Sequence, residues 1–346
     1  MMSAMSNNRI VRVDPPAAIP GGEVSVECDG YDTSNLRECG AEIGGAEARL
    51  VGAAPWRVLA TVPETPEGGE AAVVLRAPGD ARTNEARLVV GRKLAEDLHL
   101  VANPAFDPDD GSLYVTRSGS RGERLPVSLL RLSPEGDLAP VTGEIANPTG
   151  IAFDPTGQMF VTSRLDGTVY RVTAFHEIVP FARHLGVATG LAFDRLGRMY
   201  VGDRTGNIHR VGGAGESDVW ALLEPSVAAY HMAFGPDGGL YVTGPTVSSY
   251  ESVVRVDEDG RRSTFFRGLG RPQGLAFDAG GNLYVAASYG GRRGVVRLAP
   301  DGGRAELVVA GLNVVGLAFG PGGEMVVATN DSVYSLPLGI KGTLLK

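Results

Sequence analysis

The sequence of 346 residues predicts an all-β protein in two parts, a small β-sandwich over residues 1–91 and a six-bladed β-propeller over residues 92–346. Two observations predict this division. One phrase returns six times in the second part, and the first part lacks it. Both parts consist of short apolar or alternating runs separated by Pro- and Gly-rich turns, which indicates strands rather than helices.

The repeated phrase reads "GLAFDRLGRMYV" in one copy and "GLAFDAGGNLYV" in another. Successive copies are 47, 40, 41, 43 and 42 residues apart. A nearly fixed period in this range is the mark of a repeat architecture, in which each repeat forms one supersecondary unit. Measured at its phenylalanine, the phrase occurs at Phe106, Phe153, Phe193, Phe234, Phe277 and Phe319.

Each repeat contains four short runs, which are "IAFD", "MFV", "VYRV" and "EIVPFA" in the copy of Phe153. A tight turn such as "DPTG" follows the first run, because Gly supplies the positive φ of a hairpin turn. Four antiparallel strands form one propeller blade, so six copies predict six blades. We expect residues 92–98 to complete the last blade as its outer strand, which removes two exposed sheet edges. The alternative is that residues 341–346 form this strand.

The first part contains several alternating strands between Pro/Gly turns, which predicts a small β-sandwich. The order of "RVDPPAAIPGGEVSVECDGYD", "AEIGGAEARLV" and "VLATVPETPEGGEAAVVL" resembles an IPT/TIG immunoglobulin-like domain over residues 8–91. The resemblance implies a spacer or docking module without chemistry of its own. Cys28 and Cys39 are expected to be buried free thiols, with a disulfide as the alternative.

Composition restricts the function classes. The chain has 49 Gly and 22 Pro, as many turns require, and a net charge of −8 that is spread along the sequence. No basic stripe with interleaved aromatics is present, so we expect no nucleic-acid partner. The start "MMSAMSNNRIVRV" has no apolar core and no long apolar run follows, so we expect no membrane association. As given, the chain is expected to be cytoplasmic, or secreted or periplasmic if the true start lies upstream.

Residues 92–346 resemble the superfamily of six-bladed propellers that includes gluconolactonase, senescence marker protein and the luciferin-regenerating enzyme, and they overlap with NHL repeats. The phrases "PTGIAFDPTGQMFV" and "PQGLAFDAGGNLYV" carry the resemblance. It implies the fold strongly and the activity weakly, because this scaffold hosts many activities.

The resemblance also implies where a metal would bind. The lactonases of this superfamily hold a divalent cation with a Glu, an Asn and an Asp, and the Asn and Asp directly precede the Gly of the phrase. In this chain none of the six matching residues is Asp, Glu or Asn, and a hard cation such as Ca²⁺ needs carboxylate ligands. We therefore predict no metal site and no cofactor. The six residues are Ala102, Thr149, Thr189, Tyr230, Gln273 and Val315.

Two sets of polar residues recur in nearly every repeat and are expected to serve the scaffold. The arginines of the third strand are expected to bond a neighbouring carboxylate or carbonyl, and the aspartates at the turns are expected to cap them. The arginines are Arg131, Arg171, Arg210, Arg255 and Arg297. The aspartates are Asp107, Asp154, Asp194 and Asp278.

Function is expected where the copies differ. We expect Thr149, Thr189, Tyr230, His231 and Gln273 at the mouth of the central channel, with Arg164, Asp203, Arg204 and Tyr289 just beyond the second strands. His231 replaces the Gly of the phrase. Beside Tyr230 and Asp203 it could be a general base, or it could simply fill the space that a glycine leaves elsewhere.

Longer loops on the same face are the second difference between the repeats. Arg and Tyr are favoured at recognition surfaces, although such loops are also tolerated as mere insertions. The loop residues are Arg117, Arg121, Arg124, Tyr250, Tyr289, Arg292 and Arg293.

Two functions follow from the sequence. The first is a recognition protein that binds a small molecule or a protein partner at the channel mouth, with the immunoglobulin-like part as spacer or docking module. The alternative is a hydrolase or lactonase with a non-standard site. The missing carboxylates favour the binding protein, and the oligomeric state stays open.

Overall fold

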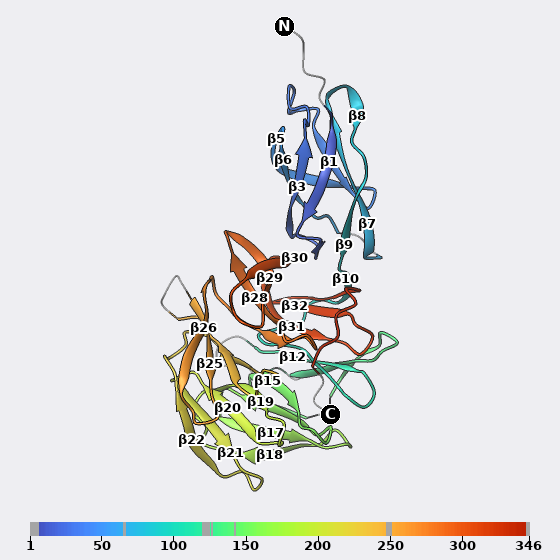
Figure 1. The fold of residues 1–346 in the computed structure, drawn as a ribbon. Helices are drawn as coiled ribbons and strands as arrows, with labels where there is room; N and C mark the ends of the chain where they lie inside the picture. Colours follow the sequence, from blue (N-terminus) through green and yellow to red (C-terminus); the bar gives the residue numbers. More distant parts are fainter. Residues whose placement is uncertain are drawn as a thin grey trace.

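The computed structural model describes residues 7–64, 67–119, 125, 127–141, 143–246 and 251–343. Within these residues the regular structure is β-strand, apart from one 3-10 turn, η1 (Pro78–Asp80). Figure 1 shows the N-terminal strands standing on one side of a ring of sheets. The described part of the chain contains no helix that is long and apolar enough to cross a membrane.

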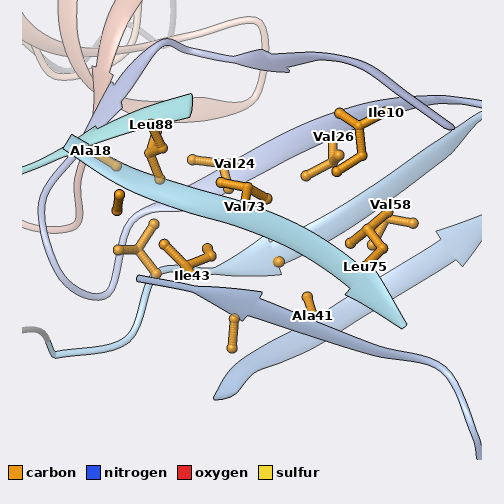
Figure 2. Packing of buried hydrophobic residues seen from close by; sticks show 14 of the residues in the cluster. Ile10, Ala18, Val24, Val26, Ala41, Ile43, Val58, Val73, Leu75 and Leu88 are labelled. Atoms are coloured by element: carbon orange, nitrogen blue, oxygen red, sulfur yellow. The ribbon is translucent and has the colours of Figure 1, made fainter. Parts of the chain in front are cut away.

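The N-terminal strands pair in the order β1-β3-β6-β5-β4-β7-β9, with β8 beside β7. Alternate residues of these strands, such as Val24, Val26 and Leu75, point into one shared core (Figure 2). Cys28 belongs to this core and Cys39 packs beside it, and both are free thiols. The strands are β1 (Arg9–Asp14), β2 (Ala17–Ala18), β3 (Glu23–Asp29), β4 (Gly40–Ile43), β5 (Ala46–Ala54), β6 (Arg57–Thr61), β7 (Gly69–Ala77), β8 (Ala81–Arg82) and β9 (Ala86–Val90).

The repeats form a β-propeller that contains five separate four-stranded antiparallel sheets. The first is β11 (Ala105–Phe106), β12 (Leu113–Thr116), β13 (Leu129–Leu132) and β14 (Leu138–Pro140). The second is β15 (Pro148–Phe153), β16 (Met159–Ser163), β17 (Thr168–Val172) and β18 (Ile178–Ala182). The third is β19 (Ala188–Phe193), β20 (Met199–Asp203), β21 (Asn207–Val211) and β22 (Ser217–Leu222). The fourth is β23 (His231–Phe234), β24 (Leu240–Thr243), β25 (Glu251–Val256) and β26 (Arg262–Leu269).

The fifth separate sheet joins the two ends of the propeller sequence, as predicted. Its order is β10-β33-β32-β31, so β10 (Arg92–Ala95) is the outer strand beside β33 (Val333–Leu336), with Lys93 opposite Tyr334. β31 (Val314–Phe319) and β32 (Met325–Thr329) complete it. The alternative outer strand is not used: Gly342 forms a bridge with Asp278 instead, and residues 344–346 lie outside the described residues.

The prediction of six separate blades is not met. The repeat of Phe277 forms β27 (Leu275–Phe277), β28 (Leu283–Tyr289), β29 (Arg292–Leu298) and β30 (Ala305–Ala310), but these strands continue a 13-stranded sheet. The link is β2, which runs parallel to both β9 and β30, with Ala17 opposite Val309. A short N-terminal strand therefore occupies the outer edge that a blade would leave open, which the repeat pattern could not reveal.

Aromatic pairs explain why the phrase is repeated. The ring of each second strand packs on the phenylalanine of the next repeat, as in Tyr200 with Phe234 at 5.1 Å between ring centroids. Edge-on pairs of this kind contribute about 0.5–1.5 kcal/mol beyond their burial. The contact between the last repeat and the first differs, because Val326 stands in place of the aromatic residue and packs near Phe106. The other four pairs are Tyr114–Phe153, Phe160–Phe193, Tyr241–Phe277 and Tyr284–Phe319.

The recurrent polar residues serve the scaffold, as predicted. Asp154 accepts hydrogen bonds from the amides of Thr156 and Gln158, and so caps its turn. Four of the five third-strand arginines form ion pairs, with Asp110, Asp218, Asp237 and Glu306. Arg171 is the exception, since its exposed side chain has no ion-pair partner among the residues described.

Candidate functional site

The channel mouth is the face on which the first strands begin and the second strands end. In this structure the two expected threonines of the mouth are hydrogen bonded within the protein. The Thr149 hydroxyl lies 3.0 Å from that of Thr162 and 3.2 Å from the carbonyl oxygen of Ala188 in the next sheet. The Thr189 hydroxyl donates to the carbonyl of Gly202 and accepts the amide of Tyr230. Each hydroxyl therefore forms a hydrogen bond that links two neighbouring sheets.

Asn103 closes the ring in a similar way. Its side-chain amide donates to the carbonyl of Leu275 at 2.9 Å and accepts the amide of Leu317 at 3.1 Å, so it joins three repeats. A Cβ at Gly274 would lie 1.9 Å from the Oδ1 of Asn103. The glycine of the phrase is therefore needed here for close approach, rather than for a ligand.

Tyr230 is wedged between two sheets. A Cβ at Gly244 would lie 2.6 Å from its ring, and its hydroxyl donates to the carbonyl of Glu224. Burial, together with the charges of Asp203 and Glu224, raises the pKa of Tyr230 to about 12. Its hydroxyl therefore stays protonated near neutral pH and is held by a structural partner.

His231 lies at the start of β23, opposite Thr243. Its side chain is buried, and this burial lowers the pKa of His231 to about 4. The imidazole is therefore neutral near pH 7 and is a weak base. No hydrogen bond or ion pair joins His231 to Asp203 in the part of the chain that the structure describes.

Asp203 organises its own loop. Its carboxylate accepts the amides of Val187 at 2.9 Å and Thr205 at 3.1 Å, and also the Thr205 hydroxyl and the Asn207 amide group. Burial alone would raise the pKa of Asp203, but these hydrogen bonds hold it below its ordinary value. The carboxylate is thus a turn acceptor, and the expected grouping of His231, Tyr230 and Asp203 is not a hydrogen-bonded triad.

The arginines beyond the second strands form no ion pair with the residues that the structure describes. Arg164 is half-buried, and its side chain donates to the carbonyl of Gly119 at 3.5 Å. Burial and the charge of Arg204 lower the pKa of Arg164, so these two cations lie near each other. Arg117 also lies here, and its Nε is buried without a partner among the described residues.

At the hairpin of β28 and β29, Arg292 contacts the N-terminal part. Arg292 forms an ion pair with the carboxylate of Asp14 and also donates to its carbonyl. Tyr289 packs against Phe266, with ring centroids 6.2 Å apart, and lines a hollow shared with Asp14. Three other loop residues expected at the mouth, Arg121, Arg124 and Tyr250, lie outside the described residues.

A cavity of about 310 Å³ opens at the mouth between β27–β30 and the β31–β33 sheet. We call it the mouth cavity. Its other walls are glycine, alanine and valine. No side-chain hydrogen bond or ion pair within the described residues engages its arginine, glutamine and asparagine side chains. Its polar lining residues are Arg271, Gln273, Ser288, Arg293, Asn313 and Asn330.

Sequence reasoning found Gln273 and Arg293 but missed Arg271, Asn313 and Asn330. Arg271 lies two residues before Gln273, and Asn313 lies two residues before Val315. The residue type at this place is not the same in all repeats, so the repeat pattern did not single it out. Their backbones share an unusual feature, since φ is +46° at Arg271 and +55° at Asn313. Asparagine tolerates this left-handed conformation, whereas for arginine it costs about 1 kcal/mol or more.

A second cavity, of about 290 Å³, lies at the opposite end of the channel. Its walls are the ends of the innermost strands, with the alanine of each phrase beside the phenylalanine. The C-terminal segment lies against it, where the Thr343 amide donates to the carbonyl of Phe277 at 3.1 Å. This end of the channel is mostly apolar, and the polar side chains among its described lining residues, Asn103, Arg195 and Thr343, donate to backbone carbonyls.

The described residues contain no group of three or more His, Cys, Asp or Glu that could hold a metal ion. The residues of the mouth cavity do not fit a hard cation either, because its lining contains two arginines and no carboxylate. The metal site of the lactonases therefore has no counterpart in the donor set of this cavity.

Comparisons with known proteins define the fold class. No protein-family model matches the sequence, and no curated protein sequence matches it. An auxiliary nutrient binding protein from Bacteroides ovatus has a similar structure over 95% of this chain and 97% of that chain, with a TM-score of 0.54 and 16% identity. A gluconolactonase from Xanthomonas campestris covers 75% of this chain and 90% of its own, with a TM-score of 0.58 and 18% identity.

Virginiamycin B lyase from Staphylococcus aureus is also similar, over 80% of this chain and 93% of its own, with a TM-score of 0.51 and 14% identity. A binding protein, a hydrolase and a lyase thus share this architecture. At such identities the similarity shows that the chain is a β-propeller and leaves the activity to the site.

Proposed function

We propose that the protein is a propeller-based binding protein whose mouth cavity takes a small molecule. The observation that carries this proposal is the set of polar side chains around the mouth cavity that have no partner within the described residues. Elsewhere at the mouth, Thr149, Thr189 and Asp203 have such partners. A concave site with a few convergent polar groups is the usual form of a small-molecule site.

The proposal includes a six-bladed ring. The hydroxyl of Thr243 donates to the carbonyl of Gln273, and the amide of Gly274 donates to the carbonyl of Val315 at 3.0 Å. These bonds support β27–β30 as a blade between its two neighbours. The pairing of β2 with β30 then attaches residues 1–91, which we propose are an IPT/TIG-like spacer or docking module.

The test is a thermal-shift screen of the full chain against a library of small metabolites. A hit should raise the melting temperature of the wild type and fail to do so in Gln273→Ala and Asn330→Ala. The matched control is Tyr289→Phe, which leaves the mouth cavity intact and should keep the response. If every hit persists in both cavity variants, the cavity is not the binding site.

The hydrolase alternative has one supporting observation, the structural similarity to a gluconolactonase. The described residues that line the mouth cavity include no Asp, Glu, His or Cys, so the cavity offers no evident general base or nucleophile. Lactone hydrolysis above the buffer rate that is lost in Gln273→Ala would favour the hydrolase over the binding protein.

A further inference from the structure

The two arginines of the mouth cavity lack the ion-pair partners that arginines such as Arg255 and Arg292 have. Arg255 binds Asp237 at 2.7 Å, and Arg292 binds Asp14. Arg271 and Arg293 form no ion pair with any residue that the structure describes. Two unpaired guanidinium groups in one cavity repel each other, and an anion between them would remove that repulsion.

None of the described residues that line the mouth cavity is acidic. The charge of Arg271 acts on the carboxylate of Glu251, but Glu251 lies outside the lining and accepts the amide of Thr246. Arg164 and Arg204 add positive charge to the same mouth. The described lining of the mouth cavity is therefore cationic, although Asp203 also lies at the mouth and the chain as a whole carries a net charge of −8.

The backbone at Arg271 gives an independent indication. Asn147, Arg271 and Asn313 occupy the same place in three repeats, two residues before Thr149, Gln273 and Val315. All three have a left-handed backbone, with φ of +47°, +46° and +55°. Local energetics favour asparagine at such a position. Arginine is thus present at Arg271 against the backbone preference, and strained residues of this kind cluster at functional sites.

We propose that the mouth cavity binds a small molecule through a carboxylate or phosphate group that Arg271 and Arg293 hold together. This inference rests on the proposed function and names the chemistry of the ligand. The side-chain amides of Gln273, Asn313 and Asn330 line the same cavity and can donate to further oxygens of the ligand. The walls of glycine, alanine and valine leave room for a compact molecule.

The experiment is calorimetric titration of the full chain with citrate, as a carboxylate probe, and with inorganic phosphate, at constant ionic strength. We expect saturable binding of at least one probe with one site per chain, and the stronger probe identifies the preferred group. Arg271→Asn and Arg293→Gln should each weaken this binding about tenfold or more, as expected for a lost charge-assisted hydrogen bond.

Arg171→Gln is the matched control, because Arg171 is exposed, unpaired among the described residues and far along the chain from the cavity. It should change the affinity less than about twofold, as a surface charge does when salt screens it. Arg271→Asn should melt at the wild-type temperature or above, since asparagine suits the left-handed backbone. A loss of binding with retained stability would separate a ligand role from a structural one.

Unchanged affinity in both cavity variants, an equal loss in Arg171→Gln, or no saturable binding of either probe at millimolar concentration would overturn the proposal. A neutral ligand that depends on Gln273 and ignores Arg271→Asn would overturn the anionic class and leave the proposed function standing. Ligands that respond to no cavity variant would overturn both.

Discussion

Tyr241 packs edge-on against Phe277 of the next repeat, with ring centroids 4.8 Å apart and ring planes at 74°. Both rings are buried, and they belong to the core between β23–β26 and β27–β30. The pair shows how the repeated phrase holds the ring together. The aromatic residue of the second strand packs on the phenylalanine of the following repeat. The phenylalanine of the same copy packs on the aromatic residue of the preceding repeat, so these contacts link successive copies.

Phe277→Leu should therefore lower the free energy of unfolding by about 1–3 kcal/mol, from the lost aromatic pair and the space left behind. Urea denaturation followed by tryptophan fluorescence would measure it. Phe175→Leu is the control, because Phe175 is 87% exposed and its loss should change little. Equal effects of the two substitutions would show that the pair does not stabilise the ring.

His231 should make the protein less stable in acid. Its pKa is about 4 when folded, below the ordinary 6.5, because burial disfavours the charged imidazole. The unfolded chain therefore binds the proton first. The stabilising effect is complete above pH 6.5 and is lost as the pH falls from there towards 4, by about 3 kcal/mol in total.

His231→Gln should flatten this part of the stability profile between pH 7.5 and 4.5, measured by urea unfolding. His176→Gln, at an exposed position, should leave the profile as it is. Parallel profiles for the wild type and His231→Gln would mean that the folded protein accommodates the imidazolium ion.

Gly22→Ala should loosen the junction between β2 and β30. A Cβ at Gly22 would lie 2.5 Å from the carbonyl oxygen of Ala310, so the backbone must shift. We expect a loss of about 1–3 kcal/mol, as for other overpacked sites. Gly52→Ala is the matched control, because a Cβ there meets nothing within 4 Å. Equal unfolding free energies for the two variants would contradict the close packing of Gly22 against Ala310.

A chain that starts at residue 97 should be less stable and prone to self-association. It lacks β10, so β33 becomes an exposed edge that can pair with another molecule. Light scattering and thermal melting would compare it with a chain that starts at residue 92, which also lacks the N-terminal strands but keeps β10. Identical behaviour of the two would argue against a closing role for β10.

The N-terminal part provides a test of domain independence. Among the described buried residues, its core is built from its own segment with only Ala310 added from the propeller, so residues 1–92 alone should unfold cooperatively on heating. A fragment without a thermal transition would place the boundary elsewhere.

Much of the fold was predictable because its signals are local. The alternation of small and aromatic residues, the Gly-containing turns and the turn aspartates such as Asp154 and Asp194 act within a few residues of the chain. The closing strand β10 was also predictable, because "GRKLAEDLHLVANPAFD" repeats the spacing of "VPFARHLGVATGLAFD".

The candidate site was predictable only in part. The sequence directed attention to Gln273 and Arg293, which line the mouth cavity. It could not show that Thr149, Thr189 and Tyr230 link neighbouring sheets, because these contacts join residues 39 and 41 positions apart and involve backbone groups that nearly every residue carries.

The sequence by itself determined the repeat, the strands and the residues that repeat, since periodicity and turn residues are local features of the sequence. Only the tertiary structure decided that β2 joins the strands of the fifth repeat to the N-terminal sheet, and that Arg271 and Arg293 share a cavity. The physical reason is that backbone pairing and cavity walls depend on which distant segments meet. The residue types within one repeat do not specify which distant segments come into contact.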